Sequence, residues 1–196
     1  MTKNRLEAFS DGVLAIIITI MVLEFKVPNN PTFEGLVPLF HKFLSYILSF
    51  IYVGIYWNNH HHMLHTVKNV NGKILWANLH LLFWLSLIPF ATAWIGEHHF
   101  APFPMLFYGI ILLMNAIAYI VLQNLIVVNH GKDSLLSKAI GKDFKGKISM
   151  IFYIVGIAAS LYFPTISGCL YIIVALLWLV PDKRIEHILD NENNQH

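Results

Sequence analysis

Long apolar runs, separated by short polar or proline-containing breaks, make up most of the chain. A helix that crosses a lipid bilayer needs roughly 20 mainly apolar residues. The pattern therefore predicts an all-α integral membrane protein, with six transmembrane helices in one domain over residues 1–181 and a short polar tail over 182–196. The expected spans are about 6–25, 37–62, 74–95, 103–128, 146–164 and 166–181.

The positions of lysine and arginine set the expected orientation. Of the 13 such residues, 11 fall at the end of the predicted bundle that holds both termini, and only Lys26 and Lys42 fall at the other end. Cytoplasmic segments of membrane proteins carry an excess of these two residue types. We therefore expect both termini to lie in the cytoplasm.

Composition agrees with a membrane protein that has little mass outside the bilayer. The chain is 57% hydrophobic and 12% charged, whereas soluble domains are about 25% charged. Its single Cys169 excludes an internal disulfide. A net charge of +2 says little about partners, and we expect no nucleic-acid partner. The first span is not expected to be a cleaved signal peptide, because Glu24-Phe25-Lys26 offers no small-residue cleavage site.

Polar residues of the first three spans fall at one depth, near the cytoplasmic side. Polar groups at that depth must be satisfied by one another or by water. We therefore expect a hydrogen-bond network that locks the first three helices together. Its members at this depth are Arg5, Ser10, Asp11, His60, His61 and Asn78.

The first span also carries an apolar stripe, separate from its polar end. At 100° per residue, one face collects Phe9, Gly12, Ile16, Ile20 and Leu23, with Thr19 at its edge. An apolar stripe normally faces lipid or packs against other helices. Periodicity alone therefore does not predict that it lines a pore.

The histidines after the second span raise the possibility of a metal site. His61 and His65, or His62 and His65, have the helical spacing of a chelating pair. No third ligand is evident, so a hydrogen-bonded structural role is favoured for His60 and His61, and no metal or other cofactor is expected. An enzyme is not expected either, because nothing near Ser10 and His60 would supply an oxyanion hole.

Four motifs, in order at the right spans, resemble one known family. They are Arg5-x-x-x-Phe9-Ser10-Asp11, Trp57-x-x-His60-His61, Asn78 of WANLHLLF, and Leu87-Ile88-Pro89-Phe90-x-Thr92. Together they resemble the prokaryotic, single-repeat form of the transmembrane protein 175 family, the endosomal and lysosomal potassium channels. The resemblance runs from about residue 5 to about residue 180.

The resemblance implies a homotetramer in the cytoplasmic (plasma) membrane of a prokaryote, in contact with lipid, with the first helix of each subunit lining a central pore. It places the pore constriction at Ile16, further apolar rings at Ile20 and Leu23, and a selectivity hydroxyl at Thr19, on the stripe that also contains Gly12. It also implies that the signature residues, Arg5 and Phe9 to Asp11, anchor that helix to its neighbours.

The implied activity is a leak-like conductance for K⁺ as the permeant ion. The chain contains no TVGYG carbonyl filter, so a hydrophobic constriction would take the place of a ring of carbonyl groups. Two alternatives stay open. One is a proton-coupled carrier that uses Asp11 and His60 or His61 as a relay, and the other is a structural membrane protein without transport activity.

Overall fold

The computed structural model describes residues 2–131, 134, 136–137 and 143–179 of the 196-residue chain. The described part is helical and contains no β-strand, which confirms the predicted all-α class. Its elements are α1 (Lys3–Leu23), the 3₁₀ helix η1 (Phe33–Leu39), α2 (Phe40–His65), α3 (Gly72–Ser86), α4 (Ile88–Glu97), α5 (Pro102–His130), α7 (Phe144–Ser160) and α8 (Pro164–Leu179). The predicted tail over 182–196 lies outside the described residues.

Within the described residues, four helical stretches are long and apolar enough to cross a membrane. They are Lys3–Leu23, Phe33–His65, Gly72–Glu97 and Pro102–His130. Helices α7 and α8 lie where the fifth and sixth spans are expected, and their described parts have 17 and 16 residues. Residues 161–163 form the turn between the two helices, so α7 ends at Ser160 and α8 begins at Pro164.

The third span is broken, which the sequence pattern did not predict. Leu87 separates α3 from α4, and Pro89 lies in the first turn of α4. A proline inside a helix removes one backbone hydrogen bond and clashes with the preceding turn, whereas the first turn tolerates it. The chain therefore ends one helix and begins another around Leu87, while the run of apolar residues continues without a gap.

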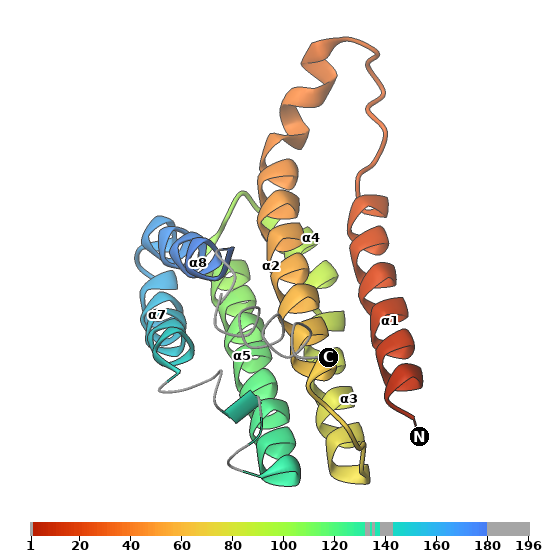
Figure 1. Ribbon diagram of the computed structural model, residues 1–196. Coiled ribbons are helices and arrows are strands. Elements are labelled where there is room, and N and C mark those ends of the chain that lie inside the picture. The colour runs from red at the N-terminus through yellow and green to blue at the C-terminus, as the bar shows by residue number, and fades with distance from the viewer. Residues whose placement is uncertain (1, 132–133, 135, 138–142, 180–196) are drawn as a thin grey trace.

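The helices are arranged with α1 at one edge and α7 at the other (Figure 1). Helix α1 contacts α2, α3 and α4, while α5 contacts α3, α4, α7 and α8. The first residues of α1, the end of α2 and the start of α3 lie at the same end of the molecule (Figure 1). The fold thus brings together the three polar helix ends that the sequence placed at one depth.

Helix α8 packs closely on α5 and α7 through Tyr171, which is fully buried. Its ring lies where a Cβ atom on Gly109 of α5 or on Gly156 of α7 would be, so neither position has room for a side chain. The backbone carbonyl of Tyr171 accepts a hydrogen bond from the Tyr52 hydroxyl of α2 at 2.5 Å. Small residues that allow close helix approach are typical of membrane-helix packing.

Candidate functional site

Helix α1 has two distinct faces. The face that packs on the rest of the subunit consists of Leu6, Ser10, Leu14, Ile17 and Met21, all buried. The opposite face is exposed, with Ile16 at 58%, Ile20 at 42% and Leu23 at 78% exposure. Gly12 and Thr19 are exposed on that face as well. The stripe that the sequence pattern defines is therefore an exposed face of the subunit.

Three of the expected network residues form a buried hydrogen-bond chain across three helices. The Ser10 hydroxyl of α1 donates to the Leu6 carbonyl at 2.8 Å and accepts from Asn78 Nδ2 of α3 at 3.0 Å. Asn78 Oδ1 in turn accepts from His60 Nε2 of α2 at 2.7 Å. All three side chains are at most 2% exposed. This chain, which we call the Ser10–Asn78–His60 clamp, fixes α1 to both neighbours.

Asp11 and His61 lie beside this clamp and are joined to Trp57 instead. The Trp57 indole Nε1 donates to Asp11 Oδ1 at 3.0 Å. The Trp57 ring stacks on the His61 ring, with 6.2 Å between centroids and an angle of 27° between the planes. His61 itself is exposed. The arrangement gives the carboxylate of Asp11 a donor from α2, one turn before His60.

The structure leaves Arg5 and Phe9 outside the clamp. Both are exposed, and the Arg5 side chain makes no hydrogen bond or ion pair with the other described residues. The ammonium group of Lys3 instead ties α1 to α2, by donating to the His65 carbonyl at 2.9 Å. The sequence analysis did not anticipate Lys3 or Trp57 as partners, although Trp57 lies within the motif that carries His60.

A large open groove runs beside the exposed face of α1. Its volume is about 840 Å³, and it lies between Val13, Ile16 and Ile20 of α1 and residues of α4 that include Phe90 and Trp94. Phe90 is 60% exposed. An exposed apolar surface of this kind on a membrane helix is covered by lipid or by another protein helix.

The histidine cluster does not converge on a metal site in the part of the chain that is described. No group of three or more histidine, cysteine, aspartate or glutamate side chains is placed to hold an ion there. The rings of His61 and His62 have centroids 5.7 Å apart, and those of His61 and His65 are 6.3 Å apart. His60 faces Asn78 rather than these neighbours.

Comparison with known proteins places this fold in one family. Residues 5–89 match the family described as endosomal/lysosomal potassium channel TMEM175. A potassium channel of Chryseobacterium sp. (strain P1-3) is 63% identical over 189 residues, which cover 96% of this chain and 98% of that protein. A potassium channel of Streptomyces collinus is 36% identical over 103 residues, about half of each chain.

A solved structure and a human protein extend the comparison. The crystal structure of a lysosomal potassium-selective channel TMEM175 homolog from Chamaesiphon minutus superposes with a TM-score of 0.79 at 28% identity, over 92% of this chain and 97% of that one. The human endosomal/lysosomal proton channel TMEM175 is 34% identical over 96 residues, which are 42% of this chain and 19% of the human protein. The family comprises ion channels and not enzymes. The chain belongs to the TMEM175 family.

Proposed function

We propose that the chain forms a potassium-permeable, leak-like channel in the cytoplasmic membrane of a prokaryote, with both termini in the cytoplasm and the exposed face of α1 lining the pore. The observation that carries the proposal is the uncovered stripe: Ile16, Ile20 and Leu23 are 42–78% exposed, while the adjacent Ile17 is 3% exposed. The similarity to bacterial potassium channels supports K⁺ as the permeant ion.

Four copies around one axis would cover this stripe and enclose a path between them. Ile16 would then form the constriction, with Ile20 and Leu23 as further apolar rings toward the outer side. A narrow apolar ring stops hydrated ions by expelling water, and no carbonyl filter is needed for that. Slight separation of the four helices would let water and ions through.

Thr19 is suited to contact an ion that has lost part of its hydration shell. Its hydroxyl donates to the Ile16 carbonyl at 2.9 Å. Because the hydroxyl proton is used in this bond, the oxygen lone pairs remain available to a cation. A ring of Thr19 oxygens would favour K⁺ modestly over Na⁺, since K⁺ gives up its water more easily.

The Ser10–Asn78–His60 clamp supports this function by fixing the rotation of α1. Ser10 lies on the buried face, so its bond to Asn78 holds the opposite face outward. The Asp11–Trp57 bond provides a second attachment at the same end. We assign Arg5, Phe9 and His61 to the same anchoring region, where all three are exposed to contacts from outside the subunit.

Ion flux into liposomes tests the proposal. Purified protein is expected to pass K⁺ in preference to Na⁺, and Ile16→Asn is expected to raise the flux and reduce the preference, because a polar side chain keeps the constriction wet. The matched control is Val22→Asn, a change of similar chemistry at a position that is also exposed, at 48%, but outside the stripe. Equal flux and selectivity in wild-type protein and Ile16→Asn would show that Ile16 does not line the pore.

A second candidate is proton transport, because vertebrate relatives are named as proton channels. Asp11 and His60 or His61 would supply the titratable groups. In the structure, however, His60 Nε2 is bonded to Asn78 and Asp11 is bonded to Trp57. A proton channel would carry ohmic currents that follow the proton gradient, and a proton-coupled carrier would show saturable transport with a fixed proton stoichiometry. The proposed channel would show ohmic currents with resolvable unitary steps that follow the K⁺ gradient.

A further inference from the structure

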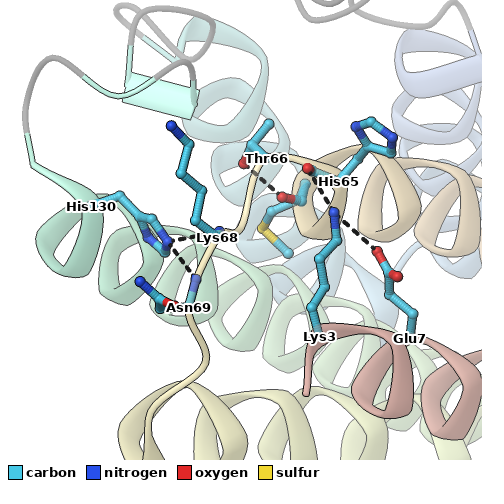
Figure 2. A network of polar contacts seen from close by, with 8 residues as sticks. Lys3, Glu7, His65, Thr66, Lys68, Asn69 and His130 are labelled. Atoms are coloured by element: carbon cyan, nitrogen blue, oxygen red, sulfur yellow. Dashed lines mark hydrogen bonds and ion pairs between the residues drawn. The ribbon is translucent and has the colours of Figure 1, made fainter. Parts of the chain in front are cut away.

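A histidine at the end of α5 contacts the loop between α2 and α3. His130, the last residue of α5, lies against the backbone of Lys68 and Asn69 (Figure 2). Its Nε2 atom is 3.0 Å from the Lys68 amide nitrogen and 3.3 Å from the Asn69 amide nitrogen. Its Nδ1 atom is 2.9 Å from the Ile126 carbonyl oxygen.

These contacts determine the protonation state of the ring. A carbonyl oxygen can only accept, so Nδ1 must carry a proton and donate it to Ile126. Backbone N–H groups can only donate, so Nε2 must present a lone pair to Lys68 and Asn69. Both sets of bonds exist together only while the imidazole is neutral. A proton on Nε2 would place an N–H group against the N–H groups of Lys68 and Asn69, and both hydrogen bonds would be lost.

We propose that His130 is a proton-sensitive latch, which fixes the α2–α3 loop to α5 at neutral or alkaline cytoplasmic pH and releases it on acidification. Histidine is the side chain that ordinarily gains its proton between pH 5 and 8. The stabilising form here is the neutral one, so the latch is intact while Nε2 carries a lone pair and is lost when Nε2 gains a proton. The proposal does not depend on whether the chain conducts ions.

Two exposed lysines lie in or next to the loop that His130 contacts. Lys68 in the loop and Lys73 at the start of α3 are exposed lysines. Farther along the same end of the molecule, Lys3 and Glu7 of α1 form an ion pair at 3.8 Å, next to His65 (Figure 2). Lys132 and Asp133, which follow α5, lie outside the described residues.

Release would act on a loop that joins two parts of the clamp. The loop connects the end of α2, which carries His60, to the start of α3, which carries Asn78. Two further bonds between asparagines hold the same loop and do not titrate: Asn71 Nδ2 donates to Asn129 Oδ1 at 2.7 Å, and Asn129 Nδ2 donates to the Asn69 carbonyl at 3.3 Å. Acid is therefore expected to loosen the loop locally rather than unfold it.

Hydrogen–deuterium exchange of the full-length protein in lipid nanodiscs tests the latch. Exchange of the Lys68 and Asn69 amides is measured at about pH 8 and about pH 5.5, on either side of ordinary histidine titration, and is corrected with an unstructured peptide of the same sequence. Protection of these two amides is expected to fall by about tenfold on acidification, as for the loss of an ordinary hydrogen bond. Unchanged protection would overturn the proposal.

Three variants separate the titration of His130 from other effects of acid. His130→Gln keeps an acceptor that does not titrate, so its protection is expected to be equal at both pH values. His130→Ala is expected to lack the protection at both. His65→Gln changes an exposed histidine at the same end, which contacts Lys3 through its backbone carbonyl, and is expected to behave as wild type. A pH response in His130→Gln equal to that of wild type would assign the effect to another group.

The ring nitrogens provide a test that needs no substitution. Nitrogen NMR of the imidazole groups, assigned through His130→Gln, is expected to show the Nδ1–H tautomer of His130 at about pH 8 and the doubly protonated ring at about pH 5.5. The Nε2–H tautomer at the higher pH would contradict the latch, because that form cannot accept from the two amides.

Discussion

Two asparagines, each fully buried within the bundle, have very different hydrogen-bond partners. Asn78 joins Ser10 of one helix to His60 of another. Asn115 donates only to the Ile111 carbonyl of its own helix, and its Oδ1 atom has no hydrogen-bond partner among the described residues. A buried polar group that stays unpaired costs about 1–3 kcal/mol. Asparagine therefore stabilises the fold at position 78 and destabilises it at position 115.

Replacing each asparagine with leucine, which has a similar shape, tests this difference. Asn78→Leu leaves His60 Nε2 and the Ser10 oxygen without their partner, so the free energy of unfolding is expected to fall by about 1–3 kcal/mol. Asn115→Leu removes an unpaired oxygen and is expected to leave the thermal midpoint unchanged or raise it. Thermal unfolding of both proteins in the same detergent checks the prediction. An equal loss in both variants would contradict it.

At the residue scale, the sequence indicated which polar side chains lie at the same depth better than it indicated which of them form hydrogen bonds with one another. Ser10, His60 and Asn78 were expected at one depth, because the span pattern fixes how far each lies from a helix end. The sequence could not show that Trp57 is the partner of Asp11, since the direction of an indole N–H depends on helix rotation and on the side-chain rotamer. His61 follows His60 by one residue, about 100° around the helix, and is therefore exposed while His60 is buried.

At the scale of elements, the contact of α8 with α5 and α7 depends on two glycines. The Tyr171 ring occupies the space that a Cβ atom on Gly109 or Gly156 would need. Added atoms in a well-packed interior typically cost about 1–3 kcal/mol. By contrast, Gly54 of α2 has open space around its Cα atom within the described subunit.

Alanine substitutions at these positions are expected to act in opposite directions. Gly109→Ala should lower the thermal midpoint, because the added methyl group would clash with the fully buried Tyr171 ring. Gly54→Ala should leave it unchanged or raise it slightly, since alanine favours a helix by about 1 kcal/mol over glycine. Thermal unfolding measures both. A Gly109→Ala protein as stable as wild type would show that the α5–α8 contact is looser than described.

The ends of the elements show where prediction from apolar patterns stops. The bounds of the first, second and fourth spans were predicted within a few residues, because polar or proline-containing segments interrupt the apolar runs there. The break at Leu87 was missed, since the residues on both sides are equally apolar. The turn over residues 161–163 was absorbed into the fifth span for the same reason, as Leu161, Tyr162 and Phe163 are apolar although they form no helix.

At the scale of the whole molecule, the uncovered face of α1 predicts how copies assemble. Ile16 and Ile17 are neighbours in the chain but lie about 100° apart around the helix, at 58% and 3% exposure. If copies of α1 surround an axis, cysteines at position 16 from different subunits approach one another. Cysteines at position 17 remain inside their own subunits.

Oxidative cross-linking in membranes tests this assembly. In a Cys169→Ser background, which removes the exposed native thiol, Ile16→Cys is expected to give a covalent dimer that is reversed by reductant. Ile17→Cys is expected to stay monomeric on the same gel. The mass of the detergent-solubilised complex then reports whether four copies are present. Equal cross-linking at both positions, or none at position 16, would argue against an axis beside the exposed face.

The short helix α7 has a consequence for the surrounding lipid. At 1.5 Å per residue its 17 residues extend only about 26 Å, whereas the hydrocarbon layer of a typical bilayer is about 30 Å thick. It also lies at the edge of the subunit opposite α1 (Figure 1). With α1 at the centre of an assembly, the outer rim would meet the acyl chains through this short helix. The bilayer would therefore be thinner next to the protein. Phospholipids with shorter acyl chains would match the hydrophobic thickness of this protein better than long-chain ones.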